Sequence, residues 1–302
     1  MYIFVIFALG GLVAQLVDGT LGMGYGVTAT TVLLAAGAAP AVASASVHMA
    51  KVGTGLASGA AHWKFGNVDW PVVSGIALPG AFGAVLGAVL LSSLAAESAA
   101  PWVAAVLVLL GAYVLLRFSV RAVAATVVRP GRLGSRFLAP VGLVAGFIDA
   151  IGGGGWGPVA TSSLLASGRL EPRKVVGSVN TAEFVVAVAA SLGFLLALSG
   201  HGISWLTVAG LLTGGVVAAP FAAWLVRAMP ARLLGTAAGG MIVLTNTGTL
   251  LGAAGVSGLP VLAVHAVLAA LWIAALVSAV QALRRDVAEA TALADEAAVA
   301  AR

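Results

Sequence analysis

Four charged residues lie well inside apolar stretches of the sequence, where an ionised side chain is unfavourable. They are Asp18, Lys51, Asp149 and Glu183, whereas the other charged residues fall in connectors or near the ends of apolar segments. A charge near the centre of a bilayer costs about 2.5–3.5 kcal/mol on insertion scales, and a functional role is its default interpretation. These four side chains are therefore candidates for binding a charged ligand or carrying a proton.

Lys51 and Glu183 occupy similar positions and carry opposite charges. Lys51 follows Pro40 by eleven residues, and Glu183 follows Pro172 by the same number. Eleven helical residues extend about 16 Å, which is roughly half the thickness of the hydrocarbon core. Both side chains are therefore expected near the midplane of a membrane.

Two polar residues accompany this pair on the same helical faces. His48 precedes Lys51 by three residues, and Asn180 precedes Glu183 by three. We expect Lys51 and His48 to offer positive charge or hydrogen-bond donors to a substrate, and Asn180 to offer a donor. Glu183 is either a partner of Lys51 or a proton carrier. The alternative is a structural pair of Lys51 and Glu183 that only holds two parts of the protein together.

Two glycine-rich segments interrupt the apolar sequence, "DGTLGMGYG" at 18–26 and "DAIGGGGWGP" at 149–158. Non-helical backbone survives at membrane depth only when it is buried in protein or lines a wet cavity. Glycine allows close approach to the main chain, and the helix that starts after each segment points N–H groups towards an anion. The predicted anion contacts are Gly22, Gly24, Tyr25, Gly153, Gly154, Gly155 and Trp156. Close helix packing is the alternative reason for these glycines.

An aspartate opens each glycine-rich segment. Asp18 and Asp149 are candidates for proton coupling or for ion pairs with the charged residues above. An acid just before a helix can also cap its free N–H groups, so a purely structural role is the alternative.

Composition places the chain in a membrane. Of its 302 residues, 61% are hydrophobic and 8% are charged, compared with roughly 25% charged residues in soluble domains. Apolar runs of about 20 residues recur along the chain, and each is long enough to cross a bilayer. The prediction is an all-α polytopic membrane protein. The first run lacks a basic leader and a cleavage site, so we interpret it as a membrane segment and not as a signal peptide.

The two halves of the sequence repeat each other. Residues 17–37 align with 148–168, so that Asp18 falls on Asp149, and the later segments align with little drift. Each half is predicted to contain two short segments around its glycine loop and then three spans. The short pieces of the second half, near 137–148 and 158–168, are expected to form a re-entrant hairpin, because a dozen residues extend only about 18 Å. Complete crossings would raise the number of spans and keep the two halves inverted.

The predicted organisation is seven spans plus two hairpins. Basic residues crowd short connectors, which marks the cytoplasmic side and headgroup contact and not nucleic-acid binding. The N-terminus is then outside and the C-terminus cytoplasmic. The predicted regions are a first repeat (1–118), a basic connector (119–136), a second repeat (137–254), a C-terminal span (255–283), and a solvated tail (284–302) that is helical or frayed.

No enzyme signature is found in the sequence. It contains no HExxH zinc motif, no P-loop and no GxSxG nucleophile elbow, and it has no cysteine. Inverted repeats with broken helices are a recurring plan of secondary transporters, which bind substrate at the midplane. Transport is thus the favoured class, without a cofactor. An anion channel, or less favoured a membrane-embedded enzyme or structural protein, is the alternative.

The two glycine segments, together with "SVHMAKV" (46–52) and "GSVNTAEF" (177–184), resemble the TauE/SafE sulfite exporter family, of the 4-toluenesulfonate uptake permease type. The resemblance covers residues 5–283. It implies a multi-pass permease of the bacterial cytoplasmic membrane that exports a small anion, sulfite or an organosulfonate, with protons as possible partners. The expected partners are this anion, protons and the lipid bilayer. The sequence predicts neither the exact substrate nor the oligomeric state.

Overall fold

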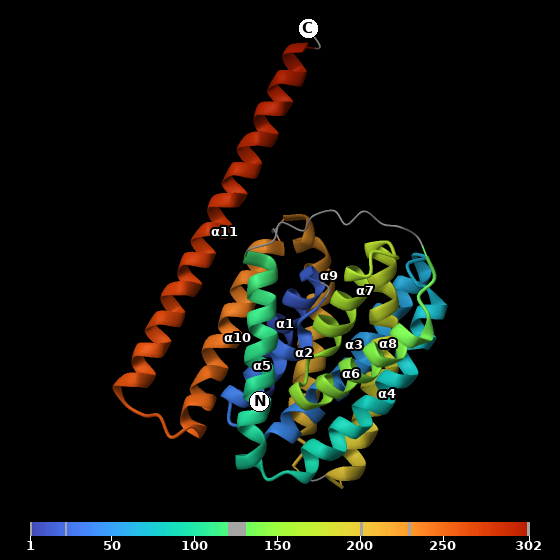
Figure 1. Ribbon diagram of the computed structural model, residues 1–302, viewed down its shortest axis with the longest axis vertical. Helices are drawn as coiled ribbons and strands as arrows, with labels where there is room; N and C mark the ends of the chain where they lie inside the picture. The colour runs from blue at the N-terminus through green and yellow to red at the C-terminus, as the bar shows by residue number, and fades with distance from the viewer. Residues whose placement is uncertain (1, 22, 120–130, 200–201, 229–230, 301–302) are drawn as a thin grey trace.

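The computed structural model describes residues 2–21, 23–119, 131–199, 202–228 and 231–300, and over these residues the regular structure is helical. Most helices pack into one bundle, and the last lies at its side (Figure 1). In chain order the elements are α1 (Tyr2–Leu21), α2 (Tyr25–Ala35), α3 (Pro40–Lys64), α4 (Trp70–Ser93), α5 (Ala96–Ser119), α6 (Ser135–Gly152), η1 (Gly157–Thr161, a π-helical turn), α7 (Ser162–Ala166), α8 (Pro172–Ala197), α9 (Trp205–Ala228), α10 (Ala231–Ala253) and α11 (Leu259–Ala300).

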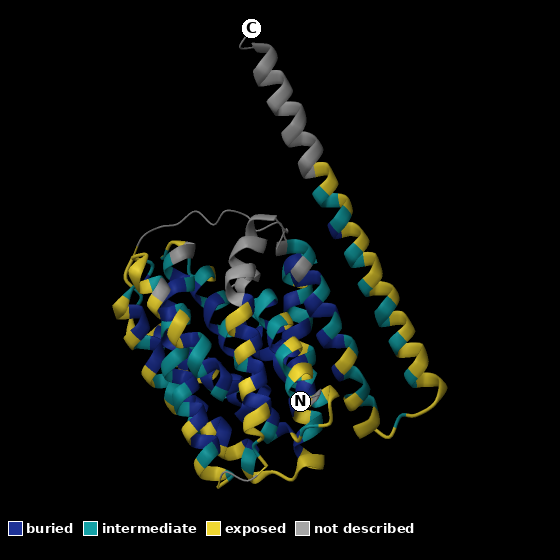
Figure 2. Ribbon diagram, turned by 180° about the vertical axis from the view of Figure 1, so that it is seen from behind, coloured by how far each residue is buried: buried dark blue, intermediate teal, exposed yellow. Residues whose placement is uncertain are grey.

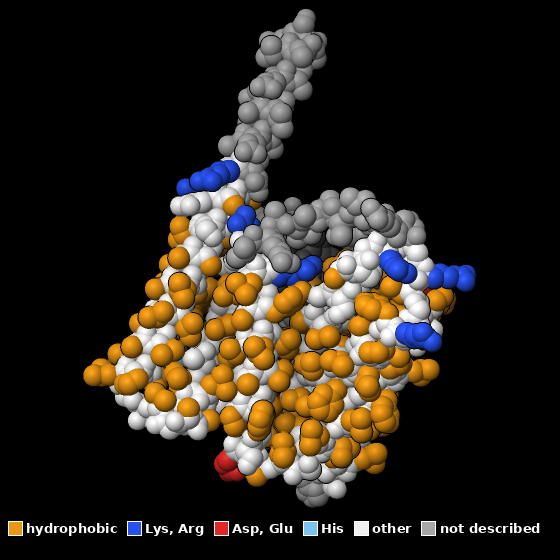
Figure 3. Space-filling model, in the orientation of Figure 1, with side chains coloured by type: hydrophobic (Ala, Val, Ile, Leu, Met, Phe, Trp, Pro, Cys, Tyr) orange, Lys and Arg blue, Asp and Glu red, His pale blue; other side chains and the backbone are white. Residues whose placement is uncertain are grey.

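The outer surface of the bundle is apolar. Large side chains such as Leu78, Leu109 and Leu196 are exposed on it, and hydrophobic atoms cover most of the visible face while Lys and Arg gather at one end (Figure 3). Among the described residues, five helices are long and apolar enough to cross a membrane, namely α4, α5, α6, α8 and α11. The predicted class, an all-α polytopic membrane protein, is confirmed.

Both predicted glycine breaks are present. The first lies between α1 and α2, where Gly24 has a φ of 122°, and the second follows α6, where Gly153 has a φ of 69°. These left-handed conformations favour glycine over any residue with a Cβ atom. Each break therefore ends one helix and lets the chain turn into a short second helix.

The first arm of the second break is longer than predicted. α6 has 18 residues and not a dozen, because it starts at Ser135 and stays helical past Asp149 to Gly152. At 1.5 Å per residue it extends about 27 Å, close to the thickness of a hydrocarbon core. The second arms are short, since α2 has 11 residues and η1 with α7 covers only 157–166.

The two ends of the α6–α7 hairpin lie together. The Gly131 N–H donates to the carbonyl of Arg169 (3.3 Å), and the guanidinium of Arg169 donates to the carbonyl of Arg132 (3.2 Å). The starts of α4 and α8 lie at this same end, where Lys174 donates to the carbonyl of Gly66 (2.7 Å). We call it the basic end of the bundle.

The α1–α2 hairpin opens at the opposite end. The start of α1 packs on α9, with Phe4 beside Gly210, and Val42 of the chain that follows α2 lies beside Gly202. α9 begins where α8 has crossed the bundle away from the basic end (Figure 1). The two hairpins therefore enter the bundle from opposite ends.

Helices from the two halves of the chain pack against each other in matching pairs. α1 packs on α9 and α6 packs on α4, while α3 pairs with α8 and α5 with α10. In the sequence repeat, α1 corresponds to α6 and α4 to α9, so the first two contacts are equivalent. Glycines bring these helices close, as where Gly146 meets the backbone of Gly80. The buried residues lie inside the bundle, whereas the described part of α11 is mainly exposed or intermediate (Figure 2).

The last helix is separate from this core. α11 contacts α10 and α5, and the indole of Trp272 donates to the carbonyl of Thr236 (2.9 Å). The most apolar stretch of α11 is not buried inside the protein, which suits a helix surrounded by lipid. It continues as one helix to Ala300, so the predicted tail is helical and does not start a separate element at residue 284.

Candidate functional site

Asp149, near the end of α6, is the centre of a buried charge cluster. Its carboxylate accepts two hydrogen bonds from the Lys51 ammonium (3.0 and 3.2 Å), one from His48 Nε2 (3.0 Å) and one from the backbone N–H of Trp156 (3.0 Å). Asp149 and His48 are fully buried. Four hydrogen bonds from three donor groups stabilise the ionised form of this carboxylate.

Lys51 joins three helices through its ammonium group. Besides Asp149 on α6, it contacts Glu183 Oε1 on α8 at 2.8 Å, and it lies on α3 itself. Its side chain is 4% exposed, and that of Glu183 is 20% exposed. The predicted pairing of Lys51 with Glu183 is therefore present, and Asp149 shares the same cation.

Asp18 and Asp149 cap the second arms of the two breaks. Asp18 accepts a hydrogen bond from the N–H of Tyr25 (3.2 Å), and Asp149 accepts one from the N–H of Trp156 (3.0 Å), in both cases seven residues on. Both aspartates therefore make the N–H contact that the capping alternative predicted, and their part in proton coupling stays a prediction. Each short helix consequently starts with one N–H group already bound to a carboxylate of the chain.

The two glycine segments meet in the middle of the bundle. A Cβ atom on Gly26 would overlap the carbonyl of Gly153, and one on Gly154 would overlap the N–H of Val27. The side chain of Thr30 fills the space beside Gly153 in the same way. Tight packing therefore accounts for Gly153 and Gly154, in agreement with the alternative drawn from the sequence.

Two small cavities adjoin the charge cluster. One of about 10 Å³ is lined by Asp18, Met23, Gly24, Tyr25, Gly26, Lys51, Asp149, Gly154, Gly157, Asn180 and Glu183. The other, of about 30 Å³, is lined by Gln15, Asp18, Tyr25, Lys51, Thr54, Gly55, Ser58, Asn180 and Glu183. A water molecule needs at least about 10–15 Å³. The site is therefore closed around a volume suited to water and is too small for a polyatomic anion.

The structure brings most predicted site residues to these cavities, but not all. Gly24, Tyr25, Lys51, Gly154 and Asn180 line them together with the three acids. His48 lies behind Asp149, and Gly153 and Gly155 face protein and not the cavity lining. Trp156 is fully buried, and its indole donates to the carbonyl of Val179 (3.0 Å). Gly22 lies outside the described residues.

Sequence reasoning missed several residues that line the cavities. Thr54 and Ser58 lie on α3 three and seven residues after Lys51, and Gln15 lies three before Asp18. The helical spacing from a charged residue was the signal that could have identified them. Asn180 was expected at the site, and it also lies 3.3 Å from His62 Nε2 through its side-chain nitrogen.

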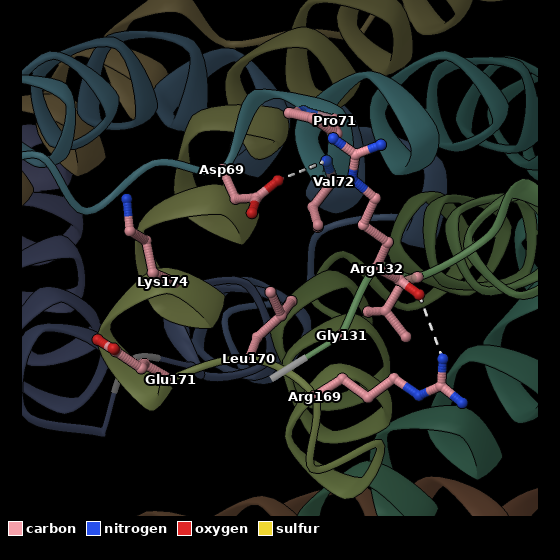
Figure 4. A pocket seen from close by; sticks show the side chains of 10 residues that line it. Asp69, Pro71, Val72, Gly131, Arg132, Arg169, Leu170, Glu171 and Lys174 are labelled. Atoms are coloured by element: carbon pink, nitrogen blue, oxygen red, sulfur yellow. Dashed lines mark hydrogen bonds between the residues drawn. The ribbon is translucent and has the colours of Figure 1, made fainter. Parts of the chain in front are cut away.

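A cavity of about 660 Å³ lies at the basic end and not at the cluster (Figure 4). Its polar residues are largely engaged in holding connectors together. Asp69 accepts from the N–H of Val72 (3.2 Å) and caps α4, while Arg169 binds the carbonyl of Arg132. Lys174 donates to the carbonyls of Gly66 and Val68. This cavity lies between the two ends of the α6–α7 hairpin and the start of α4.

An all-helical bundle with an apolar exterior, and buried charges where two interrupted helices meet, defines a polytopic membrane protein. The profile of the family described as "Sulfite exporter TauE/SafE" matches residues 7–248. The chain is also 51% identical over 247 residues to the "Probable membrane transporter protein YtnM" of Bacillus subtilis (strain 168). The aligned residues make up 82% of each of the two proteins. No solved structure matches it. The chain therefore belongs to the sulfite exporter TauE/SafE family.

Proposed function

We propose that this protein is a secondary transporter of the bacterial cytoplasmic membrane that exports a small anion, sulfite or an organosulfonate. The family and the relative described as a membrane transporter support this class. The observation that carries the proposal is the position of Lys51, whose ammonium lies between two carboxylates where the two interrupted helices meet.

The anion binds when Lys51 is released from one of its carboxylate partners. The cavities next to it hold about 10 and 30 Å³ in the present conformation, so binding requires the two halves to separate. The equivalent contacts of α1 with α9 and of α6 with α4 support an inverted repeat, in which one half rocks against the other. Such rocking exposes the site alternately to each side of the membrane.

Charge balance supports proton coupling at Glu183. Three carboxyl groups and one ammonium line the two cavities, so full ionisation leaves an excess of negative charge in a poorly solvated space. A proton on Glu183 reduces that excess and weakens its hold on Lys51, which then has donors for the anion. A divalent anion moving with one proton still carries one net negative charge, and an interior-negative potential drives it outward by about 2.3 kcal/mol per 100 mV.

Reconstitution in proteoliposomes tests this function. We expect saturable sulfite flux that depends on pH and on membrane potential. Glu183→Gln should keep the protein folded and remove the pH dependence of flux. Glu97→Gln, at an exposed carboxyl far from the cluster, should keep both the fold and the pH dependence.

The alternatives give different results in the same assay. Ohmic anion conductance without saturation would identify a channel that uses the same cluster. Complete absence of flux of sulfite and organosulfonates, in protein that unfolds cooperatively, would contradict the transport proposal.

A further inference from the structure

α3 carries a polar stripe that runs from the charge cluster to the basic end. Thr54, Ser58 and His62 follow Lys51 by three, seven and eleven residues, and these spacings place them on one helical face. Eleven residues extend about 16 Å along the helix. The stripe therefore joins the middle of the bundle to the last turn of α3, beside Lys64.

Part of this stripe lines a small cavity. Thr54 and Ser58, with Gln15 of α1 and Asn180 of α8, border the 30 Å³ cavity that also reaches Lys51 and Glu183. Glu183 keeps 20% of its side chain exposed although it lies mid-helix. Polar side chains at this depth are expected to face a wet cavity, because lipid cannot satisfy their hydrogen bonds.

His62 and Asn180 lie at the outer end of this stripe. The side-chain nitrogen of Asn180 lies 3.3 Å from His62 Nε2, and this contact joins α8 to α3. Among the described residues, the other ring nitrogen of His62, Nδ1, is buried and has no hydrogen-bond partner. Buried polar atoms are almost always satisfied, so this nitrogen should gain a partner such as water when α3 and α8 move apart.

The opposite side of Lys51 is sealed. Ser44, seven residues before Lys51, is fully buried and its hydroxyl donates to the carbonyl of Ala150. His48 is closed off by Asp149 and by the ring of Phe194, whose centroid lies 6.0 Å from its own. Lys51 is thus approached along Thr54 and Ser58 and not past Ser44.

We propose that the space between α1, α3 and α8 is a water-accessible entrance for small anions, leading from the basic end to Lys51 past the His62–Asn180 contact. Its described side chains that can donate hydrogen bonds are Gln15, Thr54, Ser58, Asn180 and His62, and Asp18 borders the same cavity at its inner end, near Lys51 and Glu183. Lys64 and Lys174 add positive charge at its mouth. The inference rests on the proposed function for the identity of the solute, and on the structure for the route.

The chain contains no cysteine, so single cysteines report this route without background. Ser58→Cys and Ser44→Cys are matched variants, since both change a serine of α3 seven residues from Lys51 and on opposite sides of it. The probe is 2-sulfonatoethyl methanethiosulfonate, a membrane-impermeant sulfonate. We expect it to label Ser58→Cys in oriented vesicles from the basic side only, faster than a cationic methanethiosulfonate does, and to leave Ser44→Cys unlabelled.

Equal labelling of the two variants, no labelling of Ser58→Cys, or faster reaction with the cationic reagent would overturn the inference. Thr54→Cys is the second variant on the route, and its labelling decides the question if Ser58→Cys does not fold. Sulfite flux is measured on the same vesicles. Labelling in vesicles without flux supports the entrance and contradicts the proposed function, whereas flux without labelling does the reverse.

Discussion

Lys51 pairs with buried Asp149 and partly buried Glu183, so its removal should affect stability as well as transport. Lys51→Met leaves Asp149 and Glu183 without their shared cation, and breaking a buried pair in this way costs about 3–5 kcal/mol. We expect a large decrease in the free energy of unfolding in detergent, together with loss of sulfite flux. Lys64→Met, at an exposed lysine of the same helix, is the control for stability and should leave the free energy of unfolding unchanged.

A compensating change separates the two roles of Lys51. Adding Asp149→Asn to Lys51→Met removes one of the unpaired charges, so most of the stability should return while flux stays absent. Recovery of flux in the double variant would show that Lys51 serves the fold alone, as in the structural-pair interpretation.

Gly154 provides a second prediction at the scale of a residue. A methyl group at this position would overlap the backbone of Val27 and Gly26, which cannot move aside as a flexible side chain could. Gly154→Ala should therefore lower the free energy of unfolding by at least about 1–3 kcal/mol, the usual result of overpacking. Gly252→Ala, in a helix with open space around it, should be neutral or slightly stabilising. Equal stability of both variants would contradict the packing role of the glycine loops.

The sequence identified the charged residues of the cluster but not all of their partners. From their equivalent depth, Glu183 was interpreted as either a partner of Lys51 or a proton carrier, and the two side chains are in contact. His48 was expected to face a substrate, whereas its Nε2 bonds Asp149, which is 101 residues away along the chain. That contact depends on how α3 packs beside the end of α6, and helical spacing within one segment carries no information about it.

At the scale of elements, apolar length and prolines located the helices well. The three spans predicted after the glycine loop of the second half correspond to α8, α9 and α10. The prediction failed for α6, since glycine and aspartate near its end suggested an earlier break. The helix ends where Gly153 adopts a left-handed conformation, and that position is set by contact with Thr30 of the other half.

Each short helix is tethered to the last long helix of the opposite half. Thr31 of α2 accepts from the amide of Asn246 on α10 (3.1 Å), and Ser162 of α7 hydrogen-bonds Tyr113 on α5. We expect Asn246→Ala and Tyr113→Phe to lower the free energy of unfolding by about 1–3 kcal/mol each, because a buried partner loses its bond.

The two tethers test whether the broken helices are held independently. In thermal or denaturant unfolding, the losses in the double variant should add, as they do for distant sites without shared partners. A double variant no weaker than one single variant would indicate that the short helices release together.

At the scale of the whole molecule, the arrangement of hairpins and charges points to one mechanism. The hairpins enter from opposite ends, yet their second arms meet at Gly26 and Gly154, so both ends of the bundle are linked to one site. Lys51, which belongs to the first half, is bound there to Asp149 and Glu183 of the second half. Movement of either half must therefore change the cluster, as alternating access requires.

The distribution of basic residues predicts how the molecule lies in the membrane. Lys64, Arg132, Arg169 and Lys174 lie at the basic end, and Arg284 and Arg285 follow the apolar part of α11, whereas Glu97 lies in the first turn of α5 at the other end. Because cytoplasmic loops carry the excess of Lys and Arg, the basic end and the C-terminus should be cytoplasmic. A green fluorescent protein fused after residue 302 should fluoresce, and alkaline phosphatase inserted in the 254–258 connector should be active. The opposite pair of results would place the mouth of the proposed entrance outside the cell, and anions would then enter the site from the external medium.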